Sequence, residues 1–391
     1  MMQALVIAHA CYGHNSFFKG NYLFRQFTQA DAIIDYMVFA RDFVLHCEER
    51  YGIEAVEEVL DSCHALMNYG VDRYKRPDPP TAKEEEQRAS RRAENAWRLY
   101  DDLWRTVPAR EIEERADASQ FPSEPQENLL YFVEKHSPRL EPWQREMVRI
   151  TRKLAQYFYP QGLTKVMNEG WASFWHYTLL NRLYDRGYVD DGFMLEFLQS
   201  HTGVITQLPF DSPAYSGINP YALGFAMMCD IKRICEAPTA EARDWFPDIA
   251  GANWRRVLDF AMRNFKDESF IAQFLSPRLM REFRLYAVAD RQFSANLEVD
   301  SIHNDQGYRR LRRLLAAQYD RDVQTPNIQV ARYKRESDRS LELLHRVHRG
   351  RPLHDDAKEV LKHLARLWGF TVRLNAVDEK GQSLHQLECR A

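Results

Sequence analysis

Residues 5–22 read LVIAHACYGHNSFFKGNY, which places His9 and His14 five residues apart behind an apolar run. At about 100° per residue, five steps in a regular α-helix turn a side chain roughly 140° away from its starting face. The two imidazoles can therefore meet at one point only if the turn between them is distorted. We expect Gly13 to permit that distortion, because glycine tolerates backbone conformations that other residues avoid.

A second stretch supplies a carboxylate. Residues 168–177 read NEGWASFWHY, in which Glu169 and His176 are seven residues apart. Seven residues make about two helical turns, so the two side chains share one face of a helix. Apolar residues cover most of the circumference between positions 166 and 184, which predicts a buried helix there.

Two histidines from one helix and a glutamate from a later helix form a ligand set that binds zinc. We predict a zinc site made of His9, His14 and Glu169. The spacing of the histidines matches the HExxxH form of zinc peptidases, in which the residue after the first histidine is the glutamate that takes a proton from bound water. Ala10 stands at that position and cannot act as a base. The alternative is that His9 and His14 are polar core residues, hydrogen-bonded to backbone or to Glu169.

Candidate catalytic residues lie beside both motifs. His176 is predicted either as a fourth ligand or as the group that hydrogen-bonds a substrate or a ligating carboxylate, and a satisfied core histidine is the alternative. Tyr12 could stabilise an oxyanion next to a metal ion, with a packing role as the alternative. If the site is catalytic, the base would be His176, Tyr12 or a group from a segment preceding the first motif.

Composition excludes several function classes. The formal net charge of −3 predicts no general attraction to nucleic acid or acidic membranes. No apolar run approaches the roughly 20 residues that span a bilayer, and no signal peptide is expected. No phosphate-binding glycine-rich motif or Gly-x-Ser-x-Gly elbow is present in the sequence. Six scattered cysteines indicate reduced thiols in a cytoplasmic protein: Cys11, Cys47, Cys63, Cys229, Cys235 and Cys389.

The hydrophobic pattern predicts a mainly α protein. A large zincin-like helical domain is expected over residues 1–290, with a charged helical connector at 77–122 inside it. A small α+β domain with a short antiparallel sheet is expected over residues 291–391, because strand-like alternation begins there. The expected strands of this sheet are residues 327–333, 340–347, 371–377 and 383–389.

Long motifs run in order from His9 to Phe370, and with them the chain resembles the SpoVR family of stage V sporulation protein R and its homologues. The motifs are HACYGHNSFFKGNYLF, DSCHALMNYGVDRYKRP, PSEPQENLLYF, EPWQREMVRI, QYFYPQGLTKVMNEGWASFWHY, YSGINPYALGFAM, FKDESFIAQFLSP and LKHLARLWGF. Members of that family usually carry a further segment before the first histidine motif. If that segment contributes residues to the site, the residues named here form only a part of the site.

The resemblance implies a role in spore cortex or peptidoglycan physiology, or in stationary-phase stress. It also implies a protein partner, either a cell-wall enzyme or a PrkA-type serine kinase system. His201 and His303 are implied as cleft residues. Two functions follow as hypotheses: a metal-dependent hydrolase acting on a peptide or peptidoglycan-related bond, or a regulator that keeps the metal fold without catalysis. The oligomeric state is not predicted.

Overall fold

The computed structural model describes residues 1–28, 30–74, 87, 91, 121–122, 124–286, 288–289, 298–299, 303–347, 353–354 and 356–390. The charged connector predicted at 77–122 lies almost wholly outside these residues. Contacts divide the chain into two compact units, each built from two separate segments. Unit 1 comprises Met1–Gln29 and Phe158–Gln324, and unit 2 comprises Ala30–Tyr157 and Thr325–Ala391.

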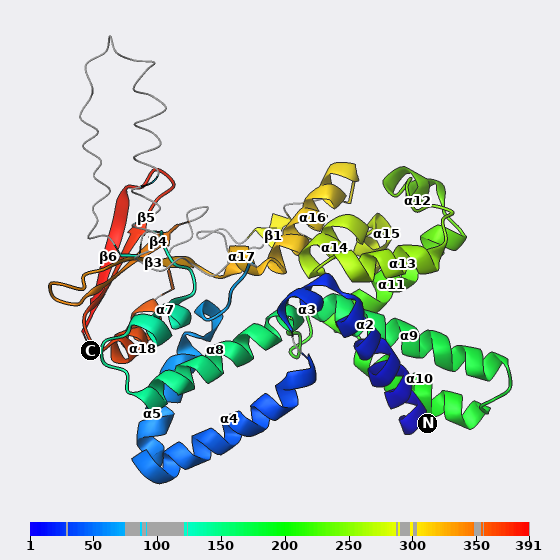
Figure 1. Cartoon of the computed structure of the whole chain (residues 1–391). Coiled ribbons are helices and arrows are strands. Elements are labelled where there is room, and N and C mark those ends of the chain that lie inside the picture. The colour runs from blue at the N-terminus through cyan, green and yellow to red at the C-terminus, as the bar shows by residue number, and fades with distance from the viewer. Residues whose placement is uncertain are drawn as a thin grey trace. The chain divides into compact units, whose positions relative to one another are not determined.

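Unit 1 is helical apart from a short strand pair (Figure 1). Its apolar core gathers bulky side chains from helices distant in the sequence, among them Phe17, Trp171 and Phe270. The elements of unit 1 are α1 (Met2–Val6), η1 (Ile7–His14), α2 (Asn15–Gly20), α3 (Tyr22–Phe27), α9 (Lys165–Asp185), α10 (Asp191–Ile205), α11 (Pro220–Glu236), α12 (Ala240–Trp245), α13 (Trp254–Asn264), α14 (Asp267–Phe274), α15 (Pro277–Glu282), β1 (Val288–Ala289), β2 (Glu298–Val299), α16 (Asp305–Gln318) and α17 (Arg321–Gln324).

Helices α9 and α11 approach each other through glycine. A Cβ added at Gly170 would lie 2.5 Å from the Cα of Gly224, and a Cβ added at Gly224 would overlap the carbonyl oxygen of Val166. No larger residue fits either position without separating the helices. This contact brings Tyr221 of α11 alongside the first turns of α9.

The N-terminus of α9 is bound by a carboxylate from another helix. Asp267, at the start of α14, accepts hydrogen bonds from the backbone N–H groups of Val166 and Met167, both at 2.8 Å. These N–H groups have no partner within their own helix, so an acceptor there stabilises the helix end. Asp267 is buried, and burial raises the pKa of its carboxyl to about 7.

Unit 2 packs helices against one small mixed sheet (Figure 1). Its core joins residues of α5 and α7 with strand residues and with Trp368 at the end of α18. Its elements are α4 (Ala30–Tyr51), α5 (Ile53–Ala65), η2 (Met67–Tyr69), α7 (Leu129–His136), α8 (Pro142–Leu163), β3 (Asn327–Tyr333), β4 (Leu341–Arg346), α18 (Ala357–Trp368), β5 (Val372–Val377) and β6 (Ser383–Cys389), the last residues of α8 belonging to unit 1.

The sheet has the order β3-β4-β5-β6. The outer pairs β3–β4 and β5–β6 are antiparallel, as predicted, but β4 and β5 are parallel, with Leu341 opposite Val372. The predicted sheet was wrong in this respect. Helix α18 connects β4 to β5. It carries the chain back to the end of the sheet at which β4 begins, so the two strands run in the same direction.

The mainly helical class with a small C-terminal sheet is confirmed. The compact units differ from the predicted division into 1–290 and 291–391, because the helices of residues 30–157 share their apolar core with the sheet. Among the described helices, none combines the length and the apolar character that a bilayer crossing requires.

We expect Gly224→Ala to destabilise the protein by about 1–3 kcal/mol or more, because the added methyl group overlaps the backbone of α9. Urea denaturation followed by circular dichroism measures the change. Gly203→Ala in α10 is the matched control, since nothing lies within 4 Å of its added Cβ. The control should unfold at the same urea concentration as the wild type or a higher one. Equal midpoints for both variants would contradict the proposed tight crossing.

Candidate metal centre

The first histidine motif lies on a π-helix. Residues Ile7–His14 form η1, and α1 and α2 continue the same helix on either side without leaving helical backbone angles. The i→i+5 hydrogen bonds of a π-helix bring residues five apart to nearly the same face. The Nε2 atoms of His9 and His14 accordingly lie 3.1 Å apart. The distorted turn predicted from the spacing is present.

Gly13 has a different role from the predicted one. Its φ does not lie in the left-handed region, so the π-helix does not depend on glycine's conformational freedom. A Cβ at Gly13 would instead lie 2.7 Å from the Cα of Ala172 in α9. Gly13 therefore allows η1 to lie directly on α9, the helix that carries Glu169.

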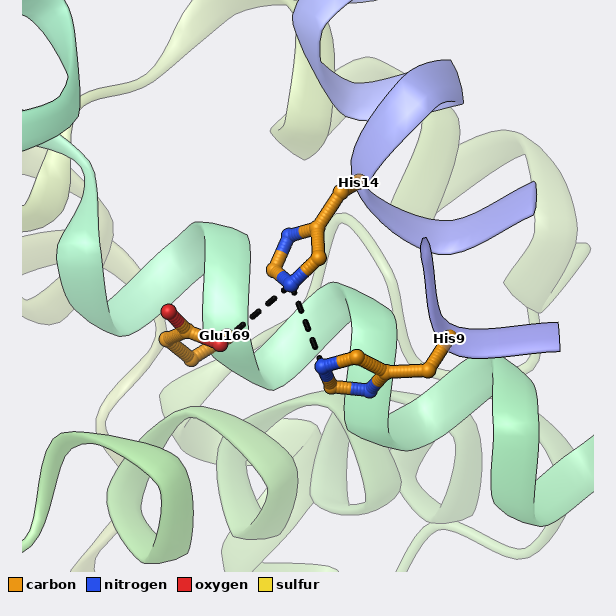
Figure 2. Close-up of side chains that lie close together, drawn as sticks. All are labelled: His9, His14 and Glu169. Atoms are coloured by element: carbon orange, nitrogen blue, oxygen red, sulfur yellow. Dashed lines mark hydrogen bonds and ion pairs between the residues drawn. The ribbon is translucent and has the colours of Figure 1, made fainter. Parts of the chain in front are cut away.

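Glu169 meets the two histidines at this crossing. Its Oε2 lies 3.5 Å from Nε2 of His14, and one ligand atom from each of His9, His14 and Glu169 lies within 4.8 Å of the others. Figure 2 shows the two imidazoles and the carboxylate directed toward a common point. All three side chains are partly buried. The predicted ligands therefore converge, although they come from two segments far apart in the sequence.

The tautomer of His14 follows from its neighbour Asn168. Nδ1 of His14 lies 2.9 Å from Oδ1 of Asn168, and an amide oxygen can only accept. The Nδ1–H of His14 therefore donates, which in the neutral ring leaves a lone pair on Nε2. That lone pair is directed at His9 and Glu169, as a metal ligand requires.

A chain of imidazoles begins on the other side of His9. Nδ1 of His9 lies 2.9 Å from Nδ1 of His176, and Nε2 of His176 lies 2.7 Å from Nδ1 of His201. Burial, followed by the charge on His14, lowers the pKa of His9 to about 4. Burial, followed by the charges on His201 and His9, lowers the pKa of His176 to about 3, and burial lowers that of His201 to about 4. All three rings are therefore neutral at pH 7.

The donor set fits a divalent cation. Oε2 of Glu169 is buried and has no hydrogen-bond partner, although it faces the lone pair of His14. Two acceptors directed at each other need either a proton or a cation between them. Two neutral imidazoles and one carboxylate are a ligand set that zinc uses. A protonated His14 paired with Glu169 is the alternative without a metal ion.

The other predicted residues lie around this cluster. His176 is buried and has both ring nitrogens engaged, so it contacts the predicted ligand His9 and not the common point. Tyr12 is 44% exposed and its ring packs 5.3 Å from that of Trp175. His303 lies elsewhere in unit 1, where it donates to the carbonyl oxygen of Leu285 and stacks on tyrosine rings.

Asn168 and Tyr221 were not predicted as site residues. Burial, followed by the neighbouring Glu169 carboxylate, raises the pKa of the Tyr221 hydroxyl. The position of Asn168 directly before Glu169 was the only sequence signal for it. Tyr221 gave no signal, because its place beside Glu169 depends on the glycine contact between α9 and α11.

We expect acid to destabilise the metal-free protein between pH 6.5 and about 3 through these histidines. Their folded-state pKa values lie below the ordinary histidine value of 6.5, so protons bind the unfolded chain first and the stabilisation is lost as pH falls. Urea midpoints measured with a chelator across this range give the slope for wild type and for His176→Phe.

Asp267 acts in the opposite direction, because its raised pKa favours the folded state as pH falls. Asp267 is present in both proteins, so its contribution cancels when wild type and His176→Phe are compared. The urea midpoint of His176→Phe should therefore fall less steeply with decreasing pH than that of the wild type. Identical slopes would argue against buried neutral imidazoles in this cluster.

Comparisons with known proteins agree with the sequence motifs. The family described as SpoVR like protein matches residues 1–324, and the SpoVR-like C-terminal domain matches residues 326–379. A relative in Escherichia coli (strain K12), named "Uncharacterized protein YcgB", is 59% identical over 388 residues, which cover 99% of this chain and 76% of the relative. No solved structure matches. The chain belongs to the SpoVR family.

Proposed function

We propose that the chain is a metal-binding SpoVR-family protein in which His9, His14 and Glu169 hold one zinc ion. The observation that supports this most strongly is the buried Oε2 of Glu169, which has no hydrogen-bond partner and faces a histidine lone pair. Each ligand is oriented from outside the cluster: His14 by Asn168, His9 by His176, and Glu169 by the contacts that fix α9. Such outer contacts are typical of metal-binding histidines.

The best-supported activity is hydrolysis. Three protein ligands leave a fourth position open for water or substrate, which is typical of catalytic zinc sites. When bound, zinc would lower the pKa of a water molecule and polarise a carbonyl group. The partial exposure of His9, His14 and Glu169 gives a substrate access to the cluster. The proposed substrate is a peptide or peptidoglycan-related amide, a class that rests on family membership alone.

The base for such a reaction is not the usual one. Ala10 occupies the position of the glutamate in zinc peptidases, and both ring nitrogens of His176 are engaged. In a catalytic protein we assign His176 a positioning role toward His9. Tyr12, on the same helix as the two histidine ligands and partly exposed, is the group that we propose to contact the substrate oxygen.

Ala10 also favours a second candidate function, in which the metal site is structural. The protein would then be a cytoplasmic regulator or scaffold that binds a cell-wall enzyme or a component of a PrkA-type serine kinase system. In this function, the ion stabilises the crossing of η1 and α9, and the surface around it binds the partner.

Metal analysis tests the ion site. We expect purified wild-type protein to bind about one zinc ion per chain, and His9→Ala and Glu169→Ala to lose most of it, because each removes one of three ligands. The measurement is elemental analysis after dialysis against zinc and then against buffer. His345→Ala is the matched control, a buried histidine in unit 2. Negligible zinc in all four proteins would refute the site.

Turnover separates the two functions. Hydrolysis of peptidoglycan fragments or peptides that is lost in His9→Ala and Glu169→Ala supports the hydrolase. If the wild type binds zinc without turnover, and if both ligand variants still bind their partner, the regulator is supported. Tyr12→Phe should lower the rate of a hydrolase by more than tenfold while leaving zinc content unchanged.

A further inference from the structure

His201 ends the imidazole chain that starts at the proposed ligand His9. It is 4% exposed, it lies on α10, and it packs among the rings of Tyr177, Phe197 and Phe225. Its Nδ1 contacts Nε2 of His176 at 2.7 Å, while its Nε2 is buried without a hydrogen-bond partner. Because Nε2 has no partner among the described residues, only the hydrogen bond to His176 bears on which ring nitrogen of His201 carries the proton.

Neutral imidazoles can form this chain in only two ways, because each ring carries one N–H and one lone pair. In the first arrangement, His9 donates from Nδ1 to His176, and His176 donates from Nε2 to His201. His9 then has its lone pair on Nε2, directed at the proposed ion, and His201 carries its proton on Nε2.

In the second arrangement, both hydrogen bonds are reversed. His201 donates from Nδ1 to His176, His176 donates from Nδ1 to His9, and His9 carries its proton on Nε2. That proton lies on the line to Nε2 of His14, 3.1 Å away, and it donates to the lone pair there. This arrangement pairs the imidazoles with one another without an ion, but it leaves Oε2 of Glu169 without a donor, and it blocks Nε2 of His9 as a ligand.

We propose that His201, acting through His176, is a positioning residue that selects the tautomer of His9, and that zinc binding reverses the direction of the chain. This inference rests on the proposed zinc site. In the reversal, the Nδ1 proton of His176 passes to His9 and the Nδ1 proton of His201 passes to His176. His9 releases its Nε2 proton to water and His201 takes one up from water at Nε2, so the number of protons on the three rings is unchanged.

The aromatic surroundings of His201 allow an informative substitution. His201→Phe fits among the neighbouring rings but removes the acceptor for the Nε2–H of His176. His176 would then keep its proton on Nδ1, which holds His9 in the tautomer that cannot bind zinc. His201→Gln retains an acceptor oxygen and should restore the ligand tautomer of His9.

The test is a zinc titration against a chromophoric chelator. We expect His201→Phe to bind zinc about 10- to 100-fold more weakly than the wild type, and His201→Gln to recover most of the affinity. The control is His345→Phe, since His345 is buried and its Nδ1 also lacks a partner, but it lies in unit 2. It should leave zinc affinity unchanged.

A second measurement uses the wild-type chain only. ¹⁵N spectra of the histidine rings should show the His201 proton moving from Nδ1 to Nε2 when zinc is added. An unchanged His201 tautomer in zinc-bound protein, or equal zinc affinity for wild type and His201→Phe, would overturn the inference while leaving the zinc site intact. A wild-type protein that binds no zinc would instead refute the site itself.

Discussion

The contact of η1 with α9 is the constraint on which the proposed site depends. Gly13 lies against Ala172 with no room for a side chain, and Gly170 makes a similar contact with Gly224 on α11. Helix α9 is thereby held between two backbones, and Asp267 fixes its N-terminus. Glu169 lies between these contacts, so the position of its carboxylate is set by backbone packing and not by a flexible side chain alone. The proposed site therefore depends on the small residues at these two crossings.

Much of the fold could be predicted from local pattern. Strands β3 and β6 begin and end at the predicted residues, because the alternation of apolar and polar residues is a property of the local sequence. The parallel pair β4–β5 could not be predicted in this way, because strand direction depends on the path of the connecting chain. The shared core of residues 30–157 and the sheet was missed for the same reason.

The candidate site, like the fold, could be predicted only where local sequence carries the information. His9, His14 and Glu169 could be named because their residue types and spacing carry chemical information. The spacing predicted a distorted turn but not specifically a π-helix. Gly13 was predicted to permit the distortion, whereas it permits the close contact with α9. Asn168 bonds a residue 154 positions away, and His201 meets His176 across 25 positions. Such partners follow from the tertiary packing of α9, which no local pattern specifies.

The order of segments in unit 1 has a consequence for how the cluster assembles. Its two parts are separated along the chain by residues 30–157, which belong to unit 2. Joining His14 to Asn168 closes a loop spanning 154 positions, and the entropic cost of closure is roughly 4.5 kcal/mol. During synthesis, residues 30–157 and then helix α9 must emerge before the histidine helix can meet its partner. An ion that binds only the joined segments would stabilise the closed loop. The stability of the amino-terminal helix in its folded position would then depend on the concentration of the metal.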